Sequence, residues 1–167
     1  NFSPYTDLAL EVAESLTNNT DNDLEGLKIF TEDCEMKKTS VTSVEITSTI
    51  GEEKMGRPMG TYITLESVFI KENNPEAHEK LIAILSKHLN QLCPLNNEKP
   101  ILVVGLGNSQ VTPDSLGPKT VDKILVTRHL KEILPDSISE TVRSVAALSP
   151  GVMGVTGIET LEVIKGI

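Results

Sequence analysis

Cysteine, basic side chains and long apolar runs are all scarce in this sequence, and each shortage excludes a class of protein. The two cysteines, Cys34 and Cys93, stand far apart and in no CxxC-like spacing, so neither a disulfide framework nor a zinc ribbon is predicted. No apolar run approaches the roughly 20 residues of a membrane-spanning helix. The 15 lysines and arginines face 24 aspartates and glutamates, and a net charge of −9 repels phosphate backbones. We therefore expect no membrane partner and no direct nucleic-acid partner.

What is present suits one globular domain. With 167 residues, of which 38% are hydrophobic and 23% charged, the chain is long enough for one domain with its own core, and two domains are not expected. The N-terminus lacks the basic start and the apolar block of a secretory signal. Together with the sparse cysteines, which fit a reducing compartment, this predicts a cytoplasmic protein.

The first half of the chain predicts one short helix followed by three strands. Leu8, Val12 and Leu16 recur every four residues, which predicts an amphipathic helix over 3–16. The stretch 17–23 has no apolar residue and predicts a loop. Runs rich in β-branched and aromatic residues then predict strands, paired in a mixed or antiparallel way, over 27–30, 41–46 and 60–66.

A polar stretch separates the last two of these strands. Residues 51–59 contain glycines, a proline, Lys54 and Arg57, and they are too polar for a core. We expect an exposed loop there.

The second half predicts a helix and then alternating strands and helices. Residues 76–92 place Leu81, Ile82, Leu85, Leu89 and Leu92 at helical spacing. The unbroken apolar run at 101–105 is typical of a central parallel strand that is buried on both faces. After a glycine-punctuated loop, the pattern predicts a helix over 117–134, a strand over 144–148 and a helix over 157–167.

This alternation indicates an α/β fold. Strand, loop and helix in that order make the first half of a βαβ unit. A helix that follows a parallel strand normally returns to another strand, but this sequence ends at Ile167 within the last helix. We therefore expect the sheet to be incomplete at the C-terminus and the chain to be the front part of a longer protein.

The loop over 105–117 is the first candidate site, because open α/β sheets bind their ligands at the carboxyl ends of the strands. Gly105 and Gly107 permit close approaches of the backbone, and Asn108 offers an amide. Asp114 stands just before the predicted helix. It is interpreted either as an N-cap of that helix or as a catalytic acid, and the two roles are compatible.

Motif searches name no reaction. The third glycine of the loop is displaced from the dinucleotide fingerprint, and the lysine of a phosphate loop is absent. GxSxG and HExxH are absent as well. The three histidines, His78, His88 and His129, lack a metal-ligand spacing, and we expect solvated helix positions for all of them. Cys93, before a proline, is interpreted as a packing residue.

Four blocks of sequence, however, resemble the germination proteases of spore-forming bacteria, which degrade small acid-soluble spore proteins. The longest are GLGNSQVTPDSLGPKTV at 105–121 and ALSPGVMGVTGIET at 147–160. YTDLALE at 5–11 and MGRPMGTYITLE at 55–66 agree as well. The likeness spans nearly the whole chain in register.

The resemblance implies a sequence-specific endopeptidase that is made as a zymogen in the forespore, processes itself near its N-terminus and acts in the spore core. Its cleavage pattern, Thr or Ser, an acid, an apolar residue, Ala, any residue and Glu, is similar to TDLALE at 6–11. The processing bond would then join Asp7 and Leu8. Residues 1–7 would be a propeptide remnant, and 8–167 the N-terminal part of a single α/β peptidase domain.

The resemblance also implies a three-layer αβα core with a mixed sheet, of the phosphorylase/hydrolase-like kind found in hydrogenase maturation proteases. The chemistry of the family is assigned to two aspartates. Asp114 matches the first, while the second lies in a strand beyond Ile167, so this chain alone is expected to be inactive. No cofactor is required as far as the sequence shows, although a divalent metal is possible by analogy with the maturation proteases. The family also implies a homotetramer.

Further residues are candidates for the substrate or active-site loop. Thr112 and Pro113 precede Asp114, and Ser149 and Gly151 end the second parallel strand at the same edge. Turn formation is the alternative role for the last two. Lys54 and Arg57 are candidates for contacts with the acidic residues of a substrate, with a solvated loop as the alternative.

Two other functions remain open. The missing second aspartate favours a non-catalytic substrate-binding or assembly fragment. LVVGLGN at 102–108 also resembles the opening of peptidyl-tRNA hydrolases, but Thr127-Arg128-His129 stands much further along the chain than that family's Thr-Arg-His element, and the acidic balance disfavours tRNA.

Overall fold

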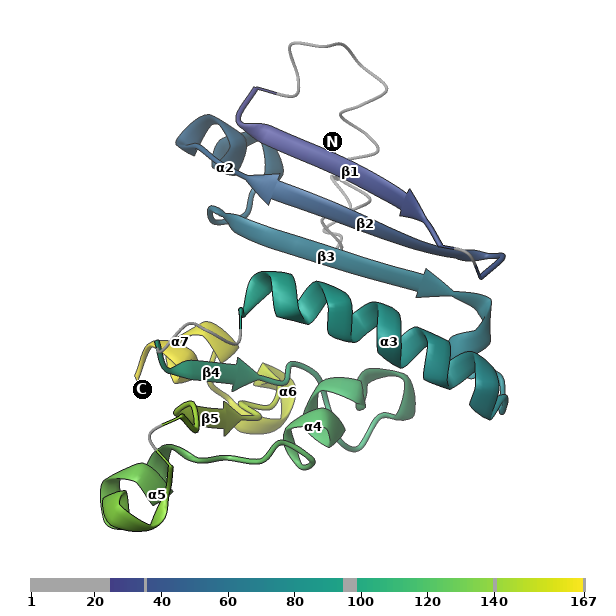
Figure 1. Cartoon of the computed structure of the whole chain (residues 1–167). Helices are drawn as coiled ribbons and strands as arrows, with labels where there is room; N and C mark the ends of the chain where they lie inside the picture. The colour runs from purple at the N-terminus through teal and green to yellow at the C-terminus, as the bar shows by residue number, and fades with distance from the viewer. Residues whose placement is uncertain (1–24, 35, 95–98, 140, 167) are drawn as a thin grey trace. The chain divides into compact units, whose positions relative to one another are not determined.

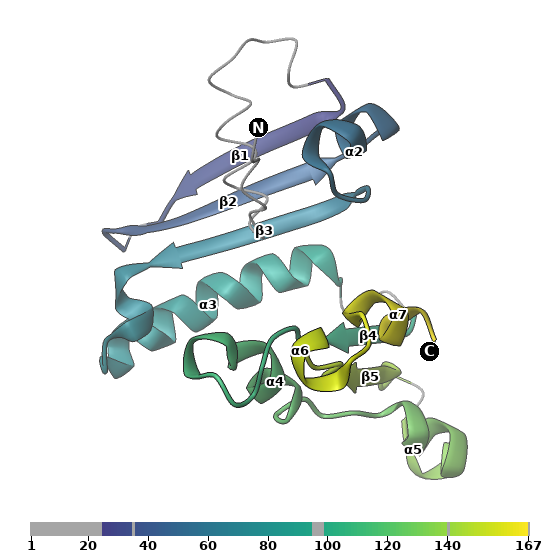
Figure 2. The ribbon, with the colours of Figure 1, turned by 180° about the vertical axis from the view of Figure 1, so that it is seen from behind.

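The computed structural model of the chain describes residues 25–34, 36–94, 99–139 and 141–166. Its elements fall into two units, Asn1–Pro94 and Leu95–Ile167, and each is described by itself (Figures 1 and 2). The helix expected over 3–16 and the loop expected over 17–23 lie outside the described residues, as do Asp7 and Leu8.

The first unit contains a three-stranded antiparallel sheet in the order β1-β2-β3 (Figure 1). The strands are β1 (Leu27–Asp33), β2 (Thr39–Ile46) and β3 (Gly60–Ser67), so the three predicted strands are confirmed. Val41 and Val44 on the central strand are each only 1% exposed, although their side chains point to opposite faces. Both faces of β2 are therefore covered.

One face of this sheet packs against α2 (Thr49–Met55). Leu27, Val44 and Ile46 form a buried cluster with Met55 of that helix. The prediction of an exposed loop over 51–59 is therefore wrong for 51–55, which are helical, whereas 56–59 do form a loop. The Ser48 hydroxyl accepts the Gly51 N–H at 3.3 Å and caps the start of α2, so a mostly polar segment can still form a helix that buries only two of its residues.

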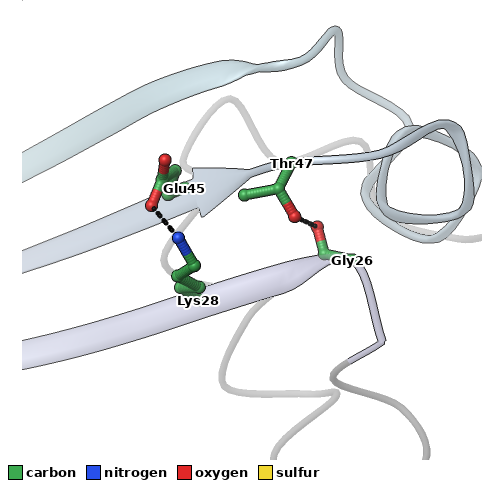
Figure 3. A network of polar contacts seen from close by, with 4 residues as sticks. All are labelled: Gly26, Lys28, Glu45 and Thr47. Atoms are coloured by element: carbon green, nitrogen blue, oxygen red, sulfur yellow. Dashed lines mark hydrogen bonds and ion pairs between the residues drawn. The ribbon is translucent and has the colours of Figure 1, made fainter.

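Polar contacts fix the beginning of β1 against the end of β2. Lys28 and Glu45 are register partners and form an ion pair at 3.1 Å, and the Thr47 hydroxyl donates to the carbonyl oxygen of Gly26 at 3.1 Å (Figure 3). A Cβ at Gly26 would lie 2.8 Å from the Gly51 nitrogen. Glycine at position 26 thus lets α2 approach the sheet.

The long helix α3 (Pro75–Leu92) follows the short 3-10 turn η2 (Val68–Lys71) and confirms the predicted helix. The Asn74 side chain caps it by accepting the Ala77 N–H at 3.1 Å. Lys87 of α3 pairs with Glu32 of β1 at 2.9 and 3.2 Å, so the helix reaches the far strand of the sheet. Its buried residues are Ala77, Leu81 and His88.

Two sequence-based expectations for α3 need correction. His88 is only 8% exposed, so the expectation of a solvated position is wrong for it. His78 is half-buried, with its Nε2 atom 3.2 Å from the carbonyl oxygen of Phe69.

The apolar repeat of α3 is largely exposed. Of the five leucine and isoleucine residues that set the helical pattern, four are exposed: Ile82, Leu85, Leu89 and Leu92.

The second unit is built on a parallel pair of strands, β4 (Ile101–Val104) and β5 (Val145–Leu148). Both strands are predicted correctly, but Leu102 is 43% exposed, so the expectation of burial on both faces is wrong. The remaining elements are η3 (Thr112–Asp114), α4 (Leu116–Val121), α5 (Arg128–Ile133), η4 (Pro135–Ser137), α6 (Met153–Thr156) and α7 (Thr160–Lys165). Both ribbon views show α6 and α7 on one face of this pair (Figure 2).

The helices of this unit are shorter than predicted. The helix expected over 117–134 is interrupted between α4 and α5, and His129 therefore lies in the first turn of α5, where it is exposed. Of the helix expected over 157–167, only α7 is observed. The preceding helix α6 ends at Gly157, which adopts the left-handed backbone conformation (φ 69°).

Thr127 explains the interruption. It is 7% exposed, and its N–H donates to the Val145 carbonyl at 2.9 Å. Its hydroxyl accepts the Val145 N–H at 2.9 Å and donates to the carbonyl of Arg143. These bonds hold the chain in a non-helical conformation beside β5.

Replacing Thr127 by valine is expected to lower the free energy of unfolding by about 1–3 kcal/mol, because the partly buried N–H of Val145 loses its acceptor. Chemical denaturation measures the loss. Thr127→Ser keeps the hydroxyl and is the matched control, expected to lose well under half as much. Equal losses in the two variants would show that the hydroxyl contributes no more than the methyl group to holding this segment.

The described residues thus form a mixed α/β protein, as predicted, with five strands in two sheets. None of the described helices is both long and apolar enough to cross a membrane. The three-layer arrangement and the domain bounds 1–7 and 8–167 stay predictions.

Candidate active site

The loops that follow β4 and β5 leave the same edge of the parallel pair. The strands are in register from Ile101 opposite Val145 to Val104 opposite Leu148, and the N–H of Gly105 extends the ladder to the carbonyl of Leu148 at 2.9 Å. The loop from 105 to 117 and the loop that begins at Ser149 therefore start side by side, as the sequence predicts.

The first of these loops folds back so that its two ends touch. A Cβ at Gly105 would overlap the carbonyl oxygen of Gly117, and a Cβ at Gly117 would overlap that of Leu106. Glycine at both positions therefore allows the first turn of α4 to lie directly against the end of β4. This role of Gly117 was not predicted from the sequence. Gly117 is the third glycine of the loop, and its displacement from the dinucleotide fingerprint was the available signal.

Asp114 ends η3 at the exposed side of this loop. The backbone N–H of Asn108 donates both to the Asp114 carboxylate, at 2.8 Å to Oδ2, and to the Asp114 carbonyl, at 3.0 Å. The N-cap interpretation of Asp114 is wrong: Ser115 occupies that position of α4 and makes no side-chain capping bond. The Asp114 carboxylate is instead held by the loop itself.

Gly107 makes this arrangement possible. Its φ of +126° lies in a region that side chains rarely adopt, and a Cβ there would overlap the Asp114 carbonyl oxygen and lie 3.0 Å from Asp114 Oδ1. Asn108 continues the turn, since its side-chain oxygen accepts the Gln110 N–H at 2.9 Å. The structure thus brings Gly107, Asn108 and Asp114 into direct contact.

The other candidates lie nearby or support the loop. Thr112 and Pro113 are exposed residues of η3, and the Thr112 carbonyl accepts the Ser115 hydroxyl at 2.9 Å. Ser149 and Gly151 lie in the neighbouring loop, where the Gly151 carbonyl accepts the Thr160 hydroxyl at 3.2 Å. Within the described part of the chain, neither of these two residues bonds to Asp114.

The described residues do not fit a divalent metal. They contain no group of three or more His, Cys, Asp or Glu side chains placed to hold an ion. Asp114, whose carboxylate accepts a backbone N–H, would contribute a single ligand. A divalent metal ion needs further oxygen or nitrogen ligands beside it.

Comparison with known proteins identifies the family. The germination protease family model matches residues 6–167. The chain belongs to the germination protease family. A germination protease from Caldanaerobacter subterraneus subsp. tengcongensis is 44% identical over 162 residues, which are 97% of this chain and 48% of the relative. Those from Clostridium acetobutylicum and Priestia megaterium are each 41% identical over 99% of this chain, and over 51% and 46% of their own lengths. The chain thus spans about half the length of the curated relatives it matches.

The family resemblance drawn from the four sequence blocks is therefore confirmed, and the likeness to peptidyl-tRNA hydrolases loses its support. The Thr127 hydroxyl of that alternative motif is engaged with the backbone of Arg143 and Val145. Arg128 pairs with Glu132 on the surface of α5 at 3.5 Å.

Proposed function

We propose that this chain supplies one of two catalytic aspartates to an endopeptidase that cuts small acid-soluble spore proteins during germination. Membership of the germination protease family supports the protease role. The observation that carries the assignment to Asp114 is its carboxylate, exposed at the carboxyl edge of β4 and β5 and fixed by the Asn108 N–H. A second aspartate, in a strand following this part of the sequence, completes the pair.

The chemistry needs both carboxylates because two close acids hold one proton between them. The ionised member takes a proton from water, which attacks the peptide carbonyl, while the protonated member gives its proton to the leaving amine. The Asn108 N–H holds the Asp114 carboxylate in place by donating to its Oδ2 atom. Asp114 and its partner together supply the two roles, activation of water and protonation of the amine.

The proposal extends to the zymogen and its setting. The protein is made in the forespore, works in the cytoplasm of the spore core and assembles as a homotetramer with a three-layer αβα core. It processes itself between Asp7 and Leu8. Gly105, Thr112, Pro113, Ser149 and Gly151 line the substrate cleft.

A peptide that contains TDLALE tests the specificity. The parent protein that includes the second aspartate is expected to cut it between Asp and Leu, and mass spectrometry of the products identifies the bond. A scrambled peptide of the same composition is the control and is expected to stay intact. Cleavage at unrelated bonds, or of both peptides alike, would contradict the proposed specificity.

The second candidate function is that of a non-catalytic substrate-binding or assembly fragment. Cleavage of the same peptide by the parent protein separates the two. Loss of cleavage in Asp114→Asn fits a catalytic aspartate, whereas an unchanged rate fits a non-catalytic role for this part of the protein.

A further inference from the structure

The first unit contains a cavity of about 370 Å³ where α3 crosses the end of β1. This volume is within the range of small-molecule pockets. The cavity is lined by side chains from the end of β1, from the turn after it and from α3: Glu32, Asp33, Cys34, Met36, Lys80, Ala83, Ile84, Lys87 and His88. None of these residues takes part in the protease chemistry proposed above.

His88 is the unusual group of this cavity. Its side chain is more than nine-tenths buried, at 8% exposure, yet it makes no hydrogen bond with any described residue. No completely buried side-chain nitrogen or oxygen of the described residues lacks a partner, so the ring nitrogens of His88 keep some exposure, and His88 lines the cavity. A buried imidazole without a partner has a free site for a proton or a ligand atom.

Cys34 brings a thiol to the same cavity. It directly follows β1, and its N–H donates to the Thr39 carbonyl at 3.1 Å, which fixes the backbone there. By strand alternation its side chain follows Glu32, which pairs with Lys87, onto the face of the sheet that α3 covers. Cys34 is half-buried, whereas Cys93 is exposed.

The charges around the thiol are balanced. Lys87 and Glu32 neutralise each other at the rim: the Lys87 ammonium lowers the pKa of Glu32, and the Glu32 carboxylate raises the pKa of Lys87. Beside this pair the cavity is lined by one further acidic residue, Asp33, and one further basic residue, Lys80, whose ammonium makes an exposed contact of 3.5 Å with Glu76. A ligand that carries both charges matches this lining.

We propose that this cavity is a thiol-exchange site, where Cys34 forms a mixed disulfide with a small zwitterionic disulfide. His88 accepts the thiol proton, and the sulfur of Cys34 attacks one sulfur of the disulfide. A new S–S bond joins Cys34 to half of the reagent as the old S–S bond breaks. The other half leaves as a thiolate and takes up the proton from His88, so Cys34 is oxidised and the leaving half is reduced.

Cystine is the probe, and the two cysteines provide the comparison. Cys93→Ser leaves Cys34 as the only thiol, and Cys34→Ser leaves Cys93. Intact-mass time courses are expected to show Cys34 reacting at least 10-fold faster than Cys93, the reverse of the order that exposure alone predicts. Dithiothreitol should remove the adduct. A Cys34 rate equal to or below that of Cys93 would overturn the proposal.

His88→Gln in the Cys93→Ser protein tests the proton acceptor, and we expect Cys34 to react at least 10-fold more slowly. Unfolding of the variant would expose Cys34 and speed the reaction, so a damaged fold cannot imitate the expected result. An unchanged rate removes His88 from the site. With 2-hydroxyethyl disulfide, which lacks both charges, the preference for Cys34 over Cys93 should shrink, and an unchanged preference would overturn the zwitterion assignment. These outcomes do not depend on the protease proposal.

Discussion

Replacing Asp114 by asparagine in the parent protein is expected to lower kcat for peptide cleavage by about 10²–10⁴-fold, the usual contribution of a general acid or base. Asparagine has almost the same shape, and its side-chain oxygen can still accept the N–H of Asn108, which Asp114 Oδ2 accepts at 2.8 Å. The loop should therefore keep its conformation and the melting temperature should stay close to that of the unchanged protein. What is lost is the ability to take and return a proton.

Asp122→Asn is the matched control, because Asp122 is an exposed aspartate of the same unit that follows α4. It removes the same charge without touching the loop, and kcat is expected to change less than about twofold. Steady-state rates and thermal melts of the two variants are compared in parallel. If Asp114→Asn cleaves at the normal rate, the carboxylate serves only as an acceptor for the loop, and the assignment of Asp114 to the reaction fails.

The parts of the fold that follow from local sequence were predicted well. β2 and β3 combine β-branched residues with an alternating pattern, and α3 combines the Asn74 cap, Pro75 at its start and a long helical repeat. In such segments local preference and tertiary packing favour the same structure. The strand order β1-β2-β3 places sequential strands side by side, which is the usual arrangement.

The errors occur where contacts between distant residues decide the structure. The segment from Thr49 to Met55 is too short and polar to show a helical repeat, and it becomes a helix because Met55 enters the cluster around Val44 and Ile46. Similarly, helical spacing continues through Thr127, but bonds to Arg143 and Val145 break the helix there. The burial of His88 depends on how α3 lies on the sheet, which its own sequence does not specify.

The candidate site was predictable in place but not in detail. The rule that ligands bind at the carboxyl ends of parallel strands is enough to select the loop after β4 and, within it, Asp114. The bond between the Asn108 N–H and the Asp114 carboxylate depends on the path of the backbone between them, which reverses at Gly107. No side-chain pattern in the sequence encodes that path, and the same is true of the contact between Gly105 and Gly117.

Gly107→Ala is expected to lower both stability and activity, because the alanine Cβ would overlap the carbonyl oxygen of the residue that carries the proposed catalytic carboxylate. Backbone strain at φ +126° adds to this overlap, and together they should lower the free energy of unfolding by about 3 kcal/mol or more. The variant can escape only by moving residues 107 and 114 apart. A displacement of roughly 1 Å at a catalytic group costs about 100-fold in rate, so we expect at least that loss in kcat.

Gly157→Ala separates the two causes, because Gly157 also has a positive φ, +69°, but nothing lies within 4 Å of a Cβ placed there. It should lose only the strain, about 1 kcal/mol, with kcat unchanged. Denaturation curves and cleavage rates of both variants, measured at a temperature where each is folded, test the difference. If folded Gly107→Ala cleaves as fast as Gly157→Ala, the contact between Gly107 and Asp114 only stabilises the loop, and the geometry that it imposes on the carboxylate is not needed for the reaction.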